Sequence, residues 1–345
     1  MPSAKDAFIS AYLKGAEARM VTSDHIDRLP KTPTVQDILE TIKDTDIGRY
    51  LEEVAIKTFD DSDRYLWRYF GQCLEWLEWL KLMPADMGKI LKAYVVKYDV
   101  INIKAVLLAI STAKRANLIP VGFIYSHGFL DELAGAENVD SVIKVAVECN
   151  LGAYAAILGE YDIEEEAKSR FLTEAKLDVE YYKDLLNLPK RMKDGSLLAQ
   201  AFSIIIDLTN LQIISRAVIE GIGSGAEEFV IGGGYMIPEK AARDLMSHKL
   251  ADIPGALGGT QYREIAEEVV ASYNRTKSIT AIEEVIDKHK FRLLREMLSP
   301  RVMTPLMIAW YLILKEVEVK NLRLVLKATF DNIAVADIKE YLLFP

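Results

Sequence analysis

One pattern of polar and apolar positions occurs three times along the chain. In each copy an acidic residue is followed three positions later by Asn, then by Ile or Leu, with Val or Ile four positions after the Asn and Ala seven positions after it. The copies cover residues 99–109, 207–217 and 318–328, and their asparagines are separated by 108 and 111 residues. Three copies, each about a third of the length apart, indicate an internally repeated architecture.

On a helix, the acid, the Asn, the branched residue and the Ala lie within an arc of about 80°, because each residue advances by about 100°. The acid and the Asn are then neighbours that can hydrogen-bond each other or a facing helix. The three pairs are Asp99 with Asn102, Asp207 with Asn210, and Glu318 with Asn321.

Two interpretations of these pairs compete. A carboxylate beside an amide in an apolar stripe can form a proton or metal site, or it can be a satisfied polar pair that fixes how helices dock. We favour the structural interpretation, because three evenly spaced copies without a neighbouring His or Cys suit architecture better than catalysis. A buried acid needs a partner, so replacement of Asn321 by Leu is expected to leave Glu318 unpaired.

Helical periodicity dominates the rest of the chain and alternating β patterns are scarce, so the predicted fold class is all-α. A further helix is expected to begin at residue 35, where Thr34 can cap it. The other expected helices cover residues 7–20, 46–59, 65–80, 86–110, 140–158, 163–188, 197–220, 238–248, 262–275, 280–298 and 305–328.

Three stretches are interpreted as breaks between helices. Residues 60–63 interrupt the helical pattern, and Ser62 or Asp63 is expected to cap the helix that follows. Residues 253–260 are expected to be flexible. The glycine-rich residues 221–225 follow a predicted helix, whereas a phosphate-binding loop requires a strand before it, so they are interpreted as a helix stop and linker.

A second matched element follows the first two copies. Gly128-Phe129-Leu130 lies 26 residues after the first Asn, and Gly234-Tyr235-Met236 lies 24 residues after the second. These elements mark boundaries between three predicted helical domains, residues 1–126, 127–234 and 235–345. Phe129, Leu130, Tyr235 and Met236 either contact a partner or pack against the neighbouring domain.

Composition narrows the function classes. The net charge of −9 over 345 residues argues against nucleic acid as a main partner and is compatible with a basic protein partner. Two cysteines imply no disulfide framework and favour a reducing compartment. Four separated histidines and no nucleophile context predict no metal, cofactor or catalytic residues. No apolar signal core is expected, and the longest apolar run, residues 305–314, is too short to span a bilayer.

The third copy carries a family resemblance. Within residues 305–323 an apolar stretch reaches Tyr311, and Lys315-Glu316, Glu318 and Asn321-Leu322-Arg323 follow. This pattern resembles the C-terminal hallmark of the C subunit of A-type and V-type ATP synthases, a family that includes the d subunit of vacuolar proton pumps. The two earlier copies and residues 16–20 also resemble that family, although Gln212 replaces a basic residue in the second copy.

The resemblance implies a funnel of three similar helical domains around a pseudo-threefold axis. It implies a non-catalytic central-rotor subunit, without cofactors, in an A-type ATP synthase or V-type ATPase. The implied partners are the D and F subunits of the central stalk and the membrane rotor ring, and the implied place is peripheral, on the cytoplasmic face. Such a subunit passes torque for ATP synthesis or for proton or sodium ion transport. The alternatives are a helical-repeat scaffold of unrelated function and an enzyme that uses an acid–Asn pair.

Overall fold

The structure is a computed structural model that describes residues 4–79, 83–161, 166–192, 195–222 and 227–345. All regular elements in these ranges are helices, which confirms the all-α prediction. Residues 223–226, within and just after the predicted glycine-rich linker, and 162–165, where the helix predicted from residue 163 would start, lie outside the described residues.

The chain forms two compact units. Unit 1 comprises the chain up to Asp99, Leu118–Leu130 and Leu298–Pro345, and unit 2 comprises Val100–Asn117 and Asp131–Met297. The division runs through one long helix, α6 (Ala85–Thr112), between Asp99 and Val100. The three domains and the pseudo-threefold funnel stay predictions.

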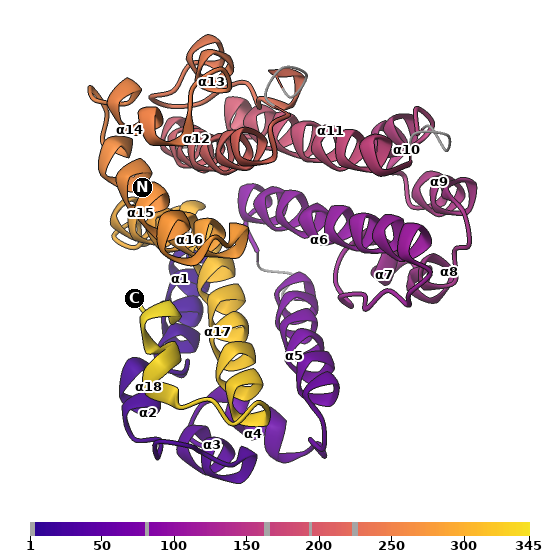
Figure 1. Cartoon of the computed structure of the whole chain (residues 1–345). Coiled ribbons are helices and arrows are strands. Elements are labelled where there is room, and N and C mark those ends of the chain that lie inside the picture. The colour runs from indigo at the N-terminus through magenta and orange to yellow at the C-terminus, as the bar shows by residue number, and fades with distance from the viewer. Residues whose placement is uncertain (1–3, 80–82, 162–165, 193–194, 223–226) are drawn as a thin grey trace. The chain divides into compact units, whose positions relative to one another are not determined.

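Unit 1 is built around α17, which lies beside α5 and also packs against α1 (Figure 1). Its core includes Leu66 and Phe70 of α5 and Leu322 of α17, all fully buried. Besides the first half of α6, its helices are α1 (Ala4–Glu17), α2 (Ser23–Asp27), α3 (Val35–Ile42), α4 (Asp46–Glu52), α5 (Phe59–Trp79), α7 (Phe123–Ser126), α17 (Leu306–Phe330), α18 (Val335–Ile338) and the 3-10 turn η4 (Lys339–Tyr341).

Unit 2 packs around α12, whose buried face includes Leu208, Leu211 and Ile214. Helices α11 and α12 run alongside each other (Figure 1). The helices are α8 (Leu130–Ala134), α9 (Val139–Glu148), α10 (Gly152–Leu158), α11 (Glu166–Asn187), α12 (Gly195–Glu220), α13 (Glu239–Leu245), α14 (Ile253–Ala256), α15 (Tyr262–Thr276) and α16 (Ile279–Leu298), with 3-10 turns η1 (Pro189–Arg191), η2 (Glu227–Phe229) and η3 (Leu250–Asp252).

The start of α5 differs from the prediction, although the predicted Thr34 cap of α3 is confirmed. Residues 60–63 do not interrupt a helix, because α5 already begins at Phe59. Thr58 accepts from the N–H of Asp61 (3.1 Å), and the Asp61 carboxylate accepts from the N–H of Thr58 (3.1 Å). This reciprocal cap satisfies two N–H groups that would otherwise be free at the helix start. Ser62, predicted as a cap, donates to Phe59 O instead.

Two further stretches also differ. The helix predicted over residues 140–158 is two helices, because Asn150 takes a left-handed conformation with φ 60° that ends α9. Asn is one of the few non-glycine residues that tolerate this conformation. Residues 253–260, predicted to be flexible, begin with the helical turn α14, where Pro254 occupies an early position that suits its fixed φ.

Candidate functional site

The three acid–asparagine pairs are buried parts of the two units. They lie on the long helices α6, α12 and α17, one pair on each. None of the six side chains is more than 5% exposed. Burial this complete is costly for a carboxylate or an amide unless its hydrogen-bonding groups are satisfied.

Asp207 of α12 holds the backbone of the segment that leads to α13. Its carboxylate accepts hydrogen bonds from the N–H groups of Tyr235 (3.0 Å), Met236 (2.7 Å) and Ile237 (3.2 Å). Hydrogen bonds to an ionised acceptor are stronger than those between neutral groups. The carboxylate therefore gathers three successive peptide groups at one point.

Asn210, one turn further along α12, binds the same segment nearer its start. Its amide nitrogen donates to Ile231 O (2.8 Å), and its oxygen accepts from Ile231 N (2.8 Å). Asn210 therefore satisfies both backbone groups of one residue, as a neighbouring β-strand does. We call Asp207, Asn210 and residues 231–237 the Asp207 clamp.

The glycines of the Asp207 clamp allow the backbone to approach the carboxylate. A Cβ at Gly234 would lie 2.1 Å from Asp207 Oδ1 and 2.5 Å from Ile237 O. Gly233 has φ +93°, a conformation that L side chains rarely adopt. Of the three glycines at residues 232–234, Gly234 is the one whose missing side chain makes room for the buried acid, whereas a Cβ at Gly233 would meet Leu186.

Asp99 of α6 makes an equivalent clamp in unit 1. Its carboxylate accepts from Phe123 N (2.8 Å) and Ile124 N (2.9 Å), the first N–H groups of α7. Gly122 precedes them with φ +110°, and a Cβ there would lie 2.3 Å from Asp99 Oδ1. We call Asp99 and residues 122–124 the Asp99 clamp. Asn102 is buried one turn further along α6.

Burial is the main cause of the shifted pKa values of Asp99 and Asp207. Loss of solvent raises the pKa of Asp99 to about 7, and the Ile124 and Phe123 N–H groups only partly oppose this. Burial likewise raises the pKa of Asp207 above its usual range, against its own N–H donors. Peptide N–H groups therefore do not offset the cost of burying these two carboxylates.

The acid of the third copy has different partners. Glu318 of α17 accepts from Val21 N (2.8 Å), which is 297 positions away in sequence, and from the ammonium of Lys315 (2.8 Å). Lys315 is only 1% exposed and also donates to the Tyr69 hydroxyl (2.9 Å). Glu318 thus joins the N-terminal part of unit 1 to its last long helix.

Asn321 repeats the behaviour of Asn210. Its amide donates to Leu343 O (2.6 Å) and accepts from Leu343 N (3.0 Å). The expectation that Asn321 pairs with Glu318 is therefore wrong, because each has a backbone partner in a different segment. A substitution at Asn321 would release the C-terminal segment rather than leave Glu318 unpaired.

A second polar cluster on α17 was missed as a site. Glu316 is 6% exposed, accepts from Lys97 (2.7 and 2.8 Å) and the Tyr94 hydroxyl, and pairs with Lys320 (2.8 Å). Burial alone would raise the pKa of Glu316, but Lys320 and Lys97 outweigh it and hold that pKa well below the usual range. In the sequence, the one sign of this cluster was the acidic Glu316 within an otherwise apolar stretch of the predicted helix.

The four candidate contact residues divide into two kinds. Phe129 and Leu130 are half-buried in unit 1. Tyr235 and Met236, in the Asp207 clamp, are 47% and 39% exposed. Of the two predicted elements, the second therefore offers more apolar surface to a partner.

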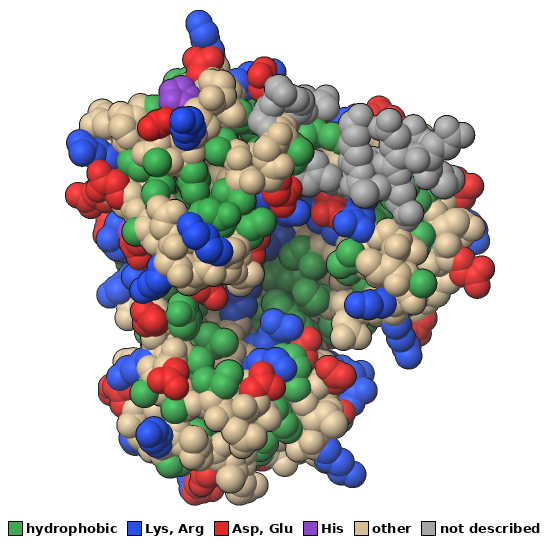
Figure 2. All heavy atoms as spheres, viewed as in Figure 1, with side chains coloured by type: hydrophobic (Ala, Val, Ile, Leu, Met, Phe, Trp, Pro, Cys, Tyr) green, Lys and Arg blue, Asp and Glu red, His purple; other side chains and the backbone are tan. Residues whose placement is uncertain are grey.

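The chemistry of these groups is structural. The acids bind peptide N–H groups or a lysine, and no group of three or more His, Cys, Asp or Glu residues that could hold a metal occurs within the described ranges. On the visible surface, basic and acidic side chains are interspersed (Figure 2). The arrangement fixes backbone segments to long helices.

One described helix, α12, is long and apolar enough by length and composition to cross a membrane. Its most apolar window has a mean hydropathy of 1.6, and 56% of that window is buried. Leu208, Leu211 and Ile214 of α12 belong to the hydrophobic core of unit 2, as expected of the central helix of a folded unit.

Comparison with known proteins gives one consistent family. The model of the ATP synthase (C/AC39) subunit family matches residues 9–341. The A-type ATP synthase C subunit of Methanocaldococcus jannaschii is 27% identical, over 98% of this chain and 86% of that protein. The C subunits of Pyrococcus abyssi (24%; 97% and 89%) and Methanothermobacter thermautotrophicus (25%; 93% and 83%) are similar over nearly their whole lengths.

These matches also decide between the alternatives set out above. The unrelated scaffold and the acid–Asn enzyme do not account for a family match over nearly the whole chain. The chain belongs to the ATP synthase (C/AC39) subunit family and is a non-catalytic subunit of a membrane-associated rotary ATPase.

Proposed function

We propose that the chain is the socket of the central rotor, which couples the D and F subunits of the stalk to the membrane rotor ring on the cytoplasmic face. It is peripheral in this proposal and carries torque during ATP synthesis or ion transport. The observation that carries the proposal is the family match over residues 9–341, together with relatives named as the C subunit of A-type ATP synthases.

The clamps supply a property that this role requires. A part that transmits torque must resist deformation where segments join, and the Asp207 clamp fixes such a join with five hydrogen bonds, three to Asp207 and two to Asn210. Each such bond contributes on the order of 1 kcal/mol net, and more when one partner is charged. Breaking one strands a buried polar group, which makes local opening costly.

Charge supports the proposed stalk contact. The net charge of −9 suits a partner whose contacting end is basic. Complementary charges guide orientation and association rate more than final affinity. The chain should therefore associate more slowly with the D and F subunits as salt rises, because screening shortens the range of attraction.

The coupling of ATP hydrolysis to ion pumping tests the proposed role directly. A complex that lacks this chain should still hydrolyse ATP in its head but should not pump ions, and added chain should restore pumping. Native mass spectrometry at low salt should also find the chain bound to the D and F subunits. Pumping that is undiminished without the chain, or folded chain that binds neither of these stalk proteins, would count against the proposal.

The three-domain funnel belongs to the same proposal. Its domains are residues 1–126, 127–234 and 235–345, each of which contains one acid–asparagine helix. Small-angle scattering of the purified chain tests it, because a hollow body and a linear stack of repeats give different distance distributions. A profile of an elongated rod would contradict the funnel.

A further inference from the structure

The segment Leu118–Leu130 of unit 1, which we call the α7 segment, is attached to the rest of that unit by few contacts. The side chains that it buries are those of Val121 and Ile124. The chain is exposed just before the segment, over residues 112–115, and again over residues 126–128. A short segment with so little buried surface can open locally while the rest of the protein stays folded.

Asp99 supplies the polar attachment of the α7 segment and is itself fully buried. Its carboxylate accepts from the N–H groups of Phe123 and Ile124. Gly122 lies so close that a Cβ there would meet Asp99 Oδ1 at 2.3 Å. These contacts exist only while the segment lies against α6, so opening would take the N–H groups away and bring the carboxylate into water.

A small cavity reaches the underside of the α7 segment. Its volume of about 60 Å³ is enough to hold water. Gly122 belongs both to the cavity wall and to the Asp99 clamp, so water has a short route to the carboxylate once the segment loosens. The other residues that line the cavity are Gly71, Leu74, Glu75, Val95, Pro120, Val121, Phe123, Tyr125 and Ser126.

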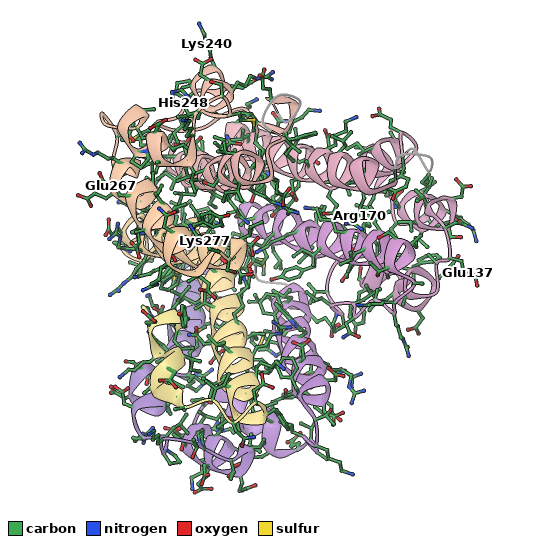
Figure 3. The ribbon with its side chains drawn as sticks, viewed as in Figure 1. Glu137, Arg170, Lys240, His248, Glu267 and Lys277 are labelled. Carbon is green, nitrogen blue, oxygen red and sulfur yellow. The ribbon has the colours of Figure 1, made fainter. Side chains whose placement is uncertain are left out.

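Asp99 has no lysine or arginine partner among the described residues. Lys97 and Lys104, the nearest lysines on either side along α6, each bind an acidic side chain elsewhere. Arg170 of α11, which lies beside α6 (Figure 3), donates to the hydroxyl of Ser111. The charge of an ionised Asp99 is therefore held by two peptide groups alone.

Two other titratable groups face this site from the elements around it. His127 is an exposed residue of the α7 segment, and Glu75 of α5 lines the cavity. Burial raises the pKa of Asp99 to about 7, and its N–H donors and the charge of His127 only partly oppose this. The closed segment therefore holds a proton on Asp99 more tightly than an open segment would.

The acid of the third copy has the cation that Asp99 lacks. Glu318 accepts from Val21 N and from the ammonium of Lys315, at 2.8 Å in each case. Because Lys315 compensates the charge of Glu318, the hold on Val21 does not require a proton. Val21 is therefore an internal reference for the behaviour of the Asp99 clamp.

We propose that the Asp99 clamp is a proton-controlled latch, which keeps the α7 segment closed on α6 while Asp99 carries a proton and lets it open locally more often once that proton is lost. The direction follows because water stabilises a free carboxylate, whereas a neutral acid tolerates burial. The latch is a property of the chain itself and does not depend on the proposed rotor role. Within that role, it would make the stiffness of unit 1 depend on pH.

The pH window follows from the two states of the latch. The pKa of Asp99 is about 7 in the closed segment and about 3.9 in an open one, where the carboxylate is in water. Opening therefore releases a proton between these values. The open population should grow as pH rises from about 4 to about 7 and should level off above that.

Amide hydrogen exchange of the full chain, followed by NMR, tests the latch. Protection factors are compared between about pH 5 and about pH 7.5, because they remove the intrinsic pH dependence of exchange. Protection at Phe123 and Ile124 should be about 10–100-fold lower at the higher pH. Protection at Val21 should stay the same, because its acceptor is compensated by Lys315.

Two variants identify the group that controls the latch. In Asp99→Asn, protection at Phe123 and Ile124 should no longer depend on pH, because nothing at that position titrates. His127→Gln is the matched control: it removes the other titratable side chain of the segment and should retain the full change. A change that survives in Asp99→Asn or disappears in His127→Gln would overturn the latch. In the wild type, unchanged protection at Phe123 and Ile124, or an equal loss at Val21, would overturn it as well.

Discussion

Asn210 binds both backbone groups of Ile231, and the carboxamide of Asn321 binds both backbone groups of Leu343 in the same way. In each case the partner lies 21 or 22 positions further along the chain. The asparagine on a long helix therefore satisfies the N–H and C=O of one residue in the segment that follows, as the backbone of a neighbouring β-strand would. These asparagines are therefore structural residues, and replacing them should change the stability of the protein measurably.

Replacement of Asn210 by Leu should destabilise unit 2 markedly. The change leaves the buried N–H and C=O of Ile231 without partners, and each stranded group costs about 1–3 kcal/mol. Urea unfolding of the full chain should show a lower midpoint. Asn274→Leu on α15 is the matched control, because Asn274 is exposed and its substitution strands no buried group. Equal midpoints for the two variants would contradict the role of Asn210.

A methyl group at residue 234 should disrupt the Asp207 clamp. In Gly234→Ala the new Cβ meets Asp207 Oδ1 at 2.1 Å and Ile237 O at 2.5 Å, so the backbone must move. We expect the free energy of unfolding to fall by about 1–3 kcal/mol, as is typical of overpacking. Gly259→Ala, where a Cβ meets nothing within 4 Å, should be neutral or slightly stabilising. Hydrogen exchange at Tyr235 and Met236 should accelerate only in the first variant.

Asp99 should make stability depend on pH in a defined window. Its pKa is about 7 when folded and about 3.9 in an unfolded chain, so the folded state binds more protons between these values. Stability should therefore fall as pH rises from about 4 to about 7 and level off above that, by a few kcal/mol at most.

The Asp99 effect is isolated by comparing wild type with Asp99→Asn across this range. As pH rises through this range, the unfolding midpoint of wild type should fall relative to that of Asp99→Asn. A wild-type profile parallel to that of Asp99→Asn would show that Asp99 does not cause the dependence.

Replacement of Lys315 by Met should destabilise unit 1. Both Lys315 and Glu318 are almost fully buried, so removing the ammonium leaves a buried carboxylate with Val21 N as its remaining partner. Breaking such a pair costs about 3–5 kcal/mol. Lys43→Met, which removes an exposed cation paired with Glu40, should leave the melting temperature unchanged. A similar small effect for both lysines would refute the importance of burial at Lys315.

The sequence predicted the helices that carry the polar stripes because side-chain periodicity reports directly which face is buried. It could not predict the partners of Asp207, because every non-proline residue has a peptide N–H and no side chain distinguishes those of residues 235–237. Gly234 was the available signal that the backbone approaches another group closely at this point.

Contacts between distant segments were equally hidden. Lys97 and Glu316 are 219 positions apart, and neither has a local pattern that points to the other. Buried Lys315 contradicts the usual expectation that lysines are exposed. At the start of α5, Thr58, Ser62 and Asp63 are all plausible caps by residue type, and only the backbone geometry selects Thr58.

Unit 1 is built from segments that lie far apart in the sequence, and this sets the order in which the two units can fold. During synthesis, α1 and α5 emerge early, but α17, which packs against both, becomes available only after more than three hundred residues. Unit 2 is complete by Met297, so it can fold first. The N-terminal helices must wait with apolar faces uncovered, a state prone to aggregation. Nascent chains stalled before α17 should therefore need chaperone protection over their first hundred residues.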